Sequence, residues 1–357
     1  MGSSSWKIRK SALCAALGLC LTLAAAPAAF AANTDGSVVG HTQPGAVVTI
    51  VDPDTGLTRT VVADAKGNYR FPFLPVGDYV LTTRVNGTQA GSSVPVTVKL
   101  GQATTVNLGS RSATNLGAVT VTANSVISAV DVTSTESAMN INAEQLQRLP
   151  VQRDVSAVAL LAPGVNPGTA GFGGISFGGS SVAENTFYIN GLNVTDFYNR
   201  IGFSEAPFDF YKEFQVKTGG YSVEYGRTTG GVVSAVAKSG TNEFRFGSKL
   251  VWGPASWETH AHDSYLDGTR YITRSRDSTD SRKLNVWASG PIVKDKLFFF
   301  AMYEARDSSP KNTNDAGTTL TKNSADTGFW GTKLDWHITD SNLLEFMAFS
   351  DKNSNVG

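Results

Sequence analysis

Apolar and polar residues alternate along five stretches in the last third of the chain. In the first stretch, Phe244, Phe246, Leu250 and Trp252 alternate with Glu243, Arg245 and Lys249. In the fourth, Trp330, Thr332, Leu334, Trp336 and Ile338 alternate with Lys333, Asp335 and His337. A period of two residues puts neighbouring side chains on opposite faces of a strand. The pattern predicts strands with one aromatic-rich face toward lipid and one face toward water, which is typical of a transmembrane β-barrel.

The gaps between these strands alternate in length. We expect the strands at residues 243–253, 282–290, 296–306, 328–338 and 342–351. The connections 254–281 and 307–327 are long and polar, whereas 291–295 and 339–341 are tight turns. Long outer loops and short periplasmic turns alternate in barrels of this kind. Residues 243–357 therefore predict the start of an antiparallel transmembrane barrel.

The N-terminus predicts export. Three basic residues precede an apolar run at 12–26, and Ala29 and Ala31 form a small-x-small cleavage site. This is the pattern of a signal peptide over residues 1–31, too short for a membrane span. Cys14 and Cys20 both lie within it, so the mature chain is expected to lack cysteine, disulfides and thiolate chemistry.

Residues 36–109 predict a small all-β domain. Two β-branched runs at 47–51 and 58–63 flank a turn at 52–56. Tyr69, Phe71 and Phe73 then alternate with other residues, and two further strands are expected at 80–83 and 94–98. The phrases Asp64-x-x-Gly67-x-Tyr69-x-Phe71 and Leu74-Pro75-x-Gly77-x-Tyr79 resemble the carboxypeptidase regulatory-like domain, which implies a transthyretin-like β-sandwich without catalytic activity.

A linker at 110–123 ends in a short β-prone run. Such a strand, between a finished domain and a new helix, is a candidate for addition to the sheet edge of another protein. The alternative is that it forms an edge strand of the sandwich. The residues of the run are Leu116, Gly117, Ala118, Val119, Thr120, Val121, Thr122 and Ala123.

Residues 124–240 predict a mixed α+β domain. Asn142 with Gln145 and, further on, Asp154 are candidate N-caps of two short helices. A glycine-rich loop is expected at 164–181, followed by a hairpin around Asn190-Gly191 and a strand at 232–237. Val155, Val158, Leu161 and Ala162 are expected on one face of the second helix.

Several phrases in this domain resemble the plug of TonB-dependent outer-membrane receptors, the Oar-like subgroup in particular. They are Leu146-x-x-Leu149-Pro150, Leu161-Ala162-Pro163-Gly164, Tyr188-Ile189-Asn190-Gly191 and the stretch from 219 to 242. The last contains the most specific plug motif: Tyr221, Glu224, Tyr225, Gly226, Arg227, Gly230 and Gly231. We expect the glycine pairs to permit tight turns where plug meets barrel, and Glu224 and Arg227 to make charged contacts in the lumen.

The resemblance implies a chain that is not a whole receptor. A barrel of about 22 strands, with roughly ten residues in each, needs about 220 residues in strands. The chain has 357 residues, which leaves 115 (357 − 242) after the plug. We therefore expect an N-terminal fragment with an incomplete barrel, which cannot insert stably alone because its strand edges are unpaired.

Composition and motifs give no sign of catalysis. The mature chain is expected to carry 27 basic and 30 acidic residues, which does not suggest nucleic-acid binding. No phosphate-binding loop or nucleophile turn occurs. The segment His260-Ala261-His262-Asp263 is expected to be a solvated loop. We predict no enzyme, no metal site and no cofactor.

The resemblance implies a receptor that takes up an unidentified extracellular ligand with energy from TonB and its inner-membrane complex. The strand at 116–123 lies where the family carries its TonB box. The barrel would contact outer-membrane lipid and the sandwich would lie in the periplasm. One alternative is a surface or secretion-linked protein of the Oar type with an adhesive or structural role, and another is an envelope enzyme.

Overall fold

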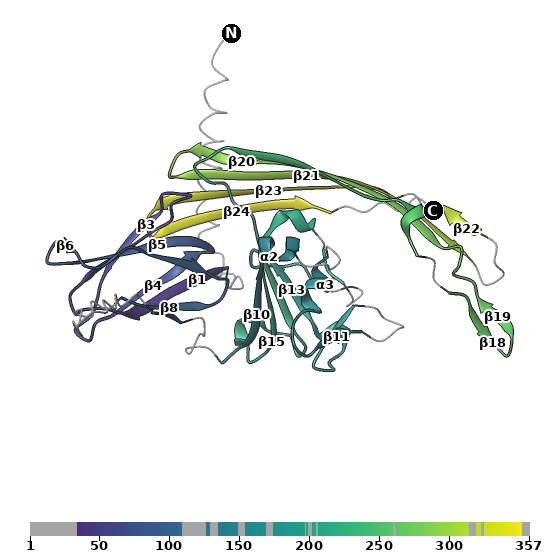
Figure 1. The fold of residues 1–357 in the computed structure, drawn as a ribbon, viewed down its shortest axis with the longest axis horizontal. Coiled ribbons are helices and arrows are strands. Elements are labelled where there is room, and N and C mark those ends of the chain that lie inside the picture. The colour runs from purple at the N-terminus through teal and green to yellow at the C-terminus, as the bar shows by residue number, and fades with distance from the viewer. Residues whose placement is uncertain are drawn as a thin grey trace, which may run out of the picture.

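The structure is a computed structural model, and it describes residues 34–108, 126–128, 135–148, 154–168, 174–196, 198, 202–204, 206–259, 262–313, 319–322 and 325–351. The predicted cleavage site and the strand predicted at 116–123 lie outside these ranges. The described chain is mainly β and forms three parts: a sandwich, a plug domain and a long curved sheet, here called the wall (Figure 1). No helix in the described ranges is long and apolar enough to cross a membrane.

The sandwich consists of two sheets. One has the order β4-β1-β8-β9, and in the other β3-β2-β5 continues into β6 while β7 also pairs with β5. The strands are β1 (Asp35–His41), β2 (Val47–Val51), β3 (Thr58–Val62), β4 (Asn68–Pro75), β5 (Gly77–Val85), β6 (Thr88–Gln89), β7 (Val94–Val98), β8 (Ala103–Asn107) and β9 (Val126–Ser128). The predicted runs correspond to β2, β3, β5 and β7, and the alternation at residues 69–73 corresponds to β4. The strands β1, β6, β8 and β9 were not predicted.

The sandwich core follows the alternation of its strands. Tyr69 and Phe71 point inward and are buried with Val38, Ile50 and Leu81. Phe73 breaks the expected pattern, since it is exposed and has a φ of 52°. The pairing of β1 with β4 shifts register between Gly36 and Val38, so a bulge turns Phe73 outward.

The plug is built on a sheet in the order β10-β15-β16-β13-β14. Its strands are β10 (Ser137–Asn142), β13 (Thr186–Ile189), β14 (Leu192–Asn193), β15 (Tyr211–Gly219) and β16 (Val232–Ala237). The helices α2 (Ala143–Arg148) and α3 (Val155–Ala159) accompany it, as do the short 3-10 turns η1 (Val182–Glu184), η2 (Phe208–Phe210) and η3 (Val223–Tyr225).

Local sequence signals account for both helix starts and the hairpin. Asn142 and Gln145 form a reciprocal capping box, with N···O distances of 2.8 and 3.0 Å. Asp154 caps α3 by accepting from the Ala157 N–H at 2.7 Å. Asn190 and Gly191 both have positive φ, as a type I′ turn requires.

Two details of the plug prediction were wrong. Leu161 is exposed, whereas Val155, Val158 and Ala162 are buried as expected, because the chain turns after the single helical turn of α3. The glycine-rich segment 164–181 contains a small hairpin of β11 (Val165–Pro167) and β12 (Ile175–Phe177). This hairpin brings Phe177 into the plug core.

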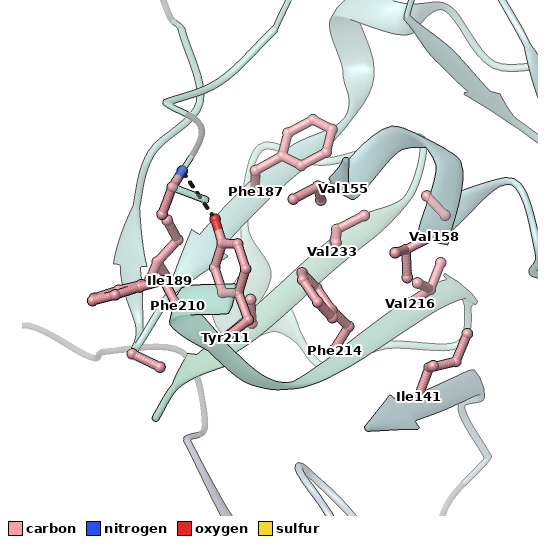
Figure 2. Close-up of a cluster of buried hydrophobic side chains, with 14 of the residues drawn as sticks. Ile141, Val155, Val158, Phe187, Ile189, Phe210, Tyr211, Phe214, Val216 and Val233 are labelled. Atoms are coloured by element: carbon pink, nitrogen blue, oxygen red, sulfur yellow. Dashed lines mark hydrogen bonds between the residues drawn. The ribbon is translucent and has the colours of Figure 1, made fainter. Parts of the chain in front are cut away.

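The plug core lies between the sheet and α3 (Figure 2). Val155 and Val158 of α3 pack over Phe214, Val216 and Val233 of the sheet. At one end, the Tyr211 hydroxyl accepts a hydrogen bond from the Ala206 N–H at 3.3 Å. Phe300, Met302 and Phe329 of the wall belong to the same buried cluster, so plug and wall share this core.

The wall confirms all five predicted strands and extends three of them. Its order is β17-β20-β21-β23-β24, all antiparallel, and the short β22 (Thr319–Lys322) pairs with β21. The strands are β17 (Arg245–Gly253), β20 (Ser278–Val293), β21 (Leu297–Thr313), β23 (Ala325–Thr339) and β24 (Asn342–Ser350). The first long connection contains η4 (Ala255–Trp257) and a hairpin of β18 (Ser264–Leu266) and β19 (Thr269–Ile272).

The two faces of the wall differ as the alternation predicts. Phe246 is 85% exposed, Leu250 68% and Trp336 47% on the outward face, whereas Lys333 is 1% exposed on the inward face. The plug and the sandwich both lie on the inward side, the plug beneath the middle of the wall and the sandwich beneath one end (Figure 1). The outward aromatic side chains thus contact no part of a closed water-soluble core.

Candidate functional site at the junction of plug and wall

The plug motif lies in the connection between β15 and β16, two inner strands of the plug sheet. Tyr225 is buried, edge-on to Tyr188 and Tyr221, and the Lys217 ammonium lies 4.5 Å from the centre of its ring. The Tyr221 hydroxyl donates to the Gly230 carbonyl at 2.9 Å, which ties the start of the motif to its end. Burial raises the pKa of the Tyr225 hydroxyl well above its usual range.

The second glycine pair serves close packing inside the plug. A Cβ added to Gly231 would come within 2.1 Å of the Phe177 ring, and one at Gly230 within 2.3 Å of the Asn185 Oδ1. The expectation of a turn against the barrel is wrong for this pair, since both neighbours belong to the plug. In the first pair, Gly220 has a φ of 67° and does make a turn.

The charged residues of the motif face solvent in this structure. Glu224, Gly226 and Arg227 are exposed, and Arg227 has a φ of 69°. Neither Glu224 nor Arg227 forms an ion pair with any residue of the described ranges. The contacts between plug and wall are made by other residues.

The first polar contact between plug and wall centres on Asp209 in η2. Its carboxylate accepts from the Lys249 ammonium of β17 at 2.8 Å and from the Asn285 amide of β20 at 3.0 Å. Lys249 and Asn285 both occupy inward positions of their strands. This contact ties one end of the plug to two neighbouring wall strands.

The second polar contact centres on Lys333 of β23. Its ammonium lies 2.9 Å from Asp335 and 3.1 Å from Glu345, and it donates to the Ser239 hydroxyl at 2.9 Å. The Asn190 side chain, at the turn of the plug hairpin, donates to the other Glu345 oxygen at 3.0 Å. Plug and wall thus share one charge network.

An aromatic seam runs between these two contacts. Phe210 of the plug packs against Phe300 and Phe329 of the wall, with ring centres 5.8 and 5.4 Å apart. Gly331 of β23 leaves the room for it, because a Cβ there would come within 2.6 Å of the Phe210 ring. The plug is held by apolar packing as well as by charge.

Sandwich, plug and wall together line a cavity of about 340 Å³. Lys212, Lys238 and Lys333 reach it, but so do Asp52 and several other carboxylates, among them Asp335 and Glu345. Burial lowers the pKa of Lys238, and also that of Lys212. The balance of charges does not select a ligand of one sign. In the described ranges no group of three or more potential ligands is placed to hold a metal ion.

The sequence located some of these residues without their partners. Alternation placed Lys249 and Lys333 on the inward face, whereas Asp209, Asn285 and Glu345 were not singled out. The sequence did offer one signal for this contact. Asp209 is a carboxylate just before a long strand of the plug, and inward lysines of the wall need an acidic partner. The predicted TonB box and cleavage site lie outside the described residues.

Two families match the chain. Residues 34–109 match the carboxypeptidase regulatory-like domain, and residues 129–233 match the TonB-dependent receptor plug domain. Over 270 residues the chain is 32% identical to the TonB-dependent transporter Oar of Myxococcus xanthus, covering 72% of this chain and 25% of that protein. The chain therefore spans about a quarter of the length of this curated relative.

Solved structures with a similar shape include the siderophore receptor PirA from Acinetobacter baumannii, at 20% identity over 62% of this chain and 32% of that one, with a TM-score of 0.46. The outer membrane transporter YddB from Escherichia coli is similar at 17% identity over 59% and 32%, with a TM-score of 0.44.

Together the domain matches and the relative show that the chain belongs to the TonB-dependent receptors. Among these it is of the Oar type, with an N-terminal carboxypeptidase regulatory-like domain. The matches indicate an outer-membrane protein.

Proposed function

We propose that the protein to which this chain belongs takes up an unidentified substrate across the outer membrane with energy transduced by TonB and its inner-membrane complex. The observation that carries this proposal is a folded plug held against the inward face of a wall whose outward face is apolar. A plug so placed blocks the lumen, so passage requires it to move. The matched relative is likewise a transporter, which supports a role other than catalysis.

The position of the sandwich supports a periplasmic location. The Arg59 guanidinium donates to the Asp340 carbonyl, in the tight turn between β23 and β24. The Asp54 carbonyl accepts from the Asn242 N–H at 2.8 Å, and Asn242 in turn bonds Asp295 in the turn between β20 and β21. Short turns of such barrels face the periplasm. The sandwich therefore lies on that side, and the outward aromatic residues meet outer-membrane lipid.

The ligand would bind at the opposite end of the wall. The hairpin of β18 and β19 projects there from the first long connection, far from the sandwich (Figure 1). Ligand binding would free residues 116–123 for TonB, which would pair with them through backbone hydrogen bonds of about 0.5–1.5 kcal/mol each. Pairing of this kind reads backbone more than side chains, which suits a run of Leu, Gly, Ala, Val and Thr.

The test is a proline in the predicted strand. Val119→Pro in the full-length protein removes one backbone donor from the pairing. We expect the purified variant to bind the periplasmic domain of TonB at least tenfold more weakly, measured by biolayer interferometry in detergent. Ala113→Pro, in the linker just before the strand, is the matched control and is expected to bind as the wild type does.

Equal binding by wild type and Val119→Pro would reject the TonB box at 116–123. Loss of binding in both proline variants would point to the linker as a whole and also count against the assignment. No binding of the wild type at all would favour the alternative, a surface or secretion-linked protein that works without TonB.

A further inference from the structure

The sandwich grips the plug with the loop between β7 and β8. Leu100, in this loop, is fully buried, yet it does not belong to the core of the sandwich. Its side chain instead packs with Val76 of another sandwich loop and Val236 of plug strand β16. An apolar side chain that a domain holds outside its own core, and buries against a second domain, is a docking contact.

Both backbone groups of Leu100 are bound by side chains of the plug. Its N–H donates to the Glu213 carboxylate at 3.0 Å, and its carbonyl accepts from Gln215 at 2.6 Å and from Asn140 at 2.9 Å. Asn140 also donates to Glu213 at 2.6 Å, so the three plug side chains form one network. Glu213 is 4% exposed and Gln215 is fully buried.

The second loop adds a further bond. The Lys212 ammonium of the plug donates to the Val76 carbonyl. Gly101, next to Leu100, has a φ of 64°, and a Cβ there would come within 2.6 Å of the Gln215 side chain. The two loops thus fit the plug surface at backbone level, where a side chain would keep them apart.

The two sandwich loops contact β15, an inner strand of the plug sheet. Lys212, Glu213 and Gln215 all belong to β15, which pairs with β10 on one side and β16 on the other. If the plug moved away from the sandwich, these hydrogen bonds would break together and the apolar contact around Leu100 would be exposed to water. Both changes cost free energy, so the contact resists movement of the plug.

The connection from the sandwich to the plug begins at the edge of the sandwich. After β8 it returns to the sandwich as β9, which pairs antiparallel with β8 through Thr105–Ser128, Val106–Ile127 and Asn107–Val126, before it reaches β10. A pull on the chain between β8 and β9 therefore acts first on the edge of the sandwich. It reaches the plug only after these three pairs have separated.

We propose that the sandwich is a latch on the periplasmic face of the plug, closed by the Leu100 loop, and that a pull by TonB opens this latch before the plug moves. The opening step rests on the proposed function; the latch itself rests on the contacts alone. The latch gives the regulatory-like domain a mechanical role: it restrains the plug while TonB exerts no force.

The experiment measures access to the buried contact. Val236→Cys is introduced into the full-length protein, with any other cysteine replaced, and labelling of the introduced thiol by a maleimide is timed in outer-membrane vesicles. Leu100→Asp is then added, because it places a carboxylate in the apolar contact with Val76 and Val236, beside the Glu213 carboxylate that the backbone of residue 100 binds, and forces the contact open from the sandwich side. Leu100→Lys, which offers Glu213 an opposite charge, and Thr88→Asp, an exposed hairpin residue of the sandwich, are the matched controls.

We expect the introduced thiol to be labelled at least tenfold faster with Leu100→Asp than with Thr88→Asp or without a second substitution, and Leu100→Lys to lie in between. Equal rates in all four proteins would overturn the latch. In intact cells, TonB should speed the labelling of this thiol, and Val119→Pro should cancel the effect. If TonB binds the wild type but leaves the labelling rate unchanged, the opening step is wrong although the proposed function stands.

Discussion

Lys333 is a buried cation shared by plug and wall. Its ammonium is close to Asp335 and Glu345 and also reaches the plug through Ser239. Removing one partner of a buried charge network leaves the remaining charges uncompensated. We expect Lys333→Met to lower the free energy of unfolding of the full-length protein by roughly 3–5 kcal/mol. The measurement is thermal unfolding in detergent, followed by circular dichroism and by loss of the compact band on gels.

Lys283→Met is the control for this change. Lys283 lies in β20, which β21 separates from β23, and is exposed, so its loss is expected to change stability by less than about 0.5 kcal/mol. Equal effects of the two substitutions would mean that the network at Lys333 contributes no more than a surface charge does.

Asp35 lies at the start of the sandwich and makes the stability of the sandwich depend on pH. Burial, and then the charge of Glu345, raises the pKa of the Asp35 carboxyl from 3.8 to about 6. The folded state holds this proton more tightly than the unfolded state. Its contribution is therefore full below pH 3.8 and is lost as the pH rises to about 6, with a slope of up to about 1.4 kcal/mol per pH unit.

We expect Asp35→Asn to remove this slope. The check is hydrogen exchange of β1 and β8 amides in the full-length protein between pH 4 and 7, corrected for the intrinsic exchange rate. The wild type should lose protection as the pH rises, and the variant should not. A slope that survives in Asp35→Asn would assign the pH dependence to another group.

The direction of a single side chain was predictable where it depends only on the two-residue period of its strand. The inward direction of Lys249, Lys333 and His337 and the outward direction of Phe246 followed from alternation. Phe73 failed because a bulge shifts the period within β4. The partner of Lys249 could not be read from its own strand, since Asp209 lies in a different domain.

At the scale of elements, close packing of β16 on the β11–β12 hairpin depends on a glycine. The Gly231 Cα lies against the Phe177 ring, and a Cβ there would overlap it at 2.1 Å. We expect Gly231→Ala to destabilise the plug by about 1–3 kcal/mol through overpacking. Protease resistance of the plug in the purified full-length protein, measured as a function of temperature, is the readout.

Gly219→Ala, in the same stretch of the plug, is the matched control. A Cβ at Gly219 has no neighbour within 4 Å, and its φ is not positive. It should therefore leave the plug as resistant as the wild type. If both variants lose resistance equally, these glycines matter for backbone freedom and not for contact with Phe177.

Elements with strong local signals were predicted well. Capping residues fixed the starts of α2 and α3, and Asn190-Gly191 fixed the hairpin. The long strand β15 was not among the predicted elements; it carries the polar residues Lys212, Glu213, Gln215 and Lys217. The structure buries these polar side chains against the sandwich, against Glu136 and against Tyr225. Only the neighbouring parts of the chain explain why they are strand residues.

At the scale of the whole molecule, the three parts are arranged around one polar interior. The wall presents its charges to the plug, and the sandwich closes the plug from the end with the tight turns. The sequence predicted each part and the order of the parts. It did not predict that the sandwich reaches the plug through two loops, because neither Leu100 nor Val76 carries a local signal for this contact.

The wall also determines whether this chain can insert by itself. Among the described strands, β17 and β24 each pair on one side only. In lipid, every unpaired backbone group on these two edges costs several kcal/mol, since no water is present to replace the missing partner. We therefore expect the 357-residue chain, expressed alone, to give no heat-modifiable, SDS-resistant band, whereas the full-length protein gives one. Such a band from the 357-residue chain would show that its strands find partners, either in a second copy or by closing on themselves, and that the open sheet is not the state it adopts in a membrane.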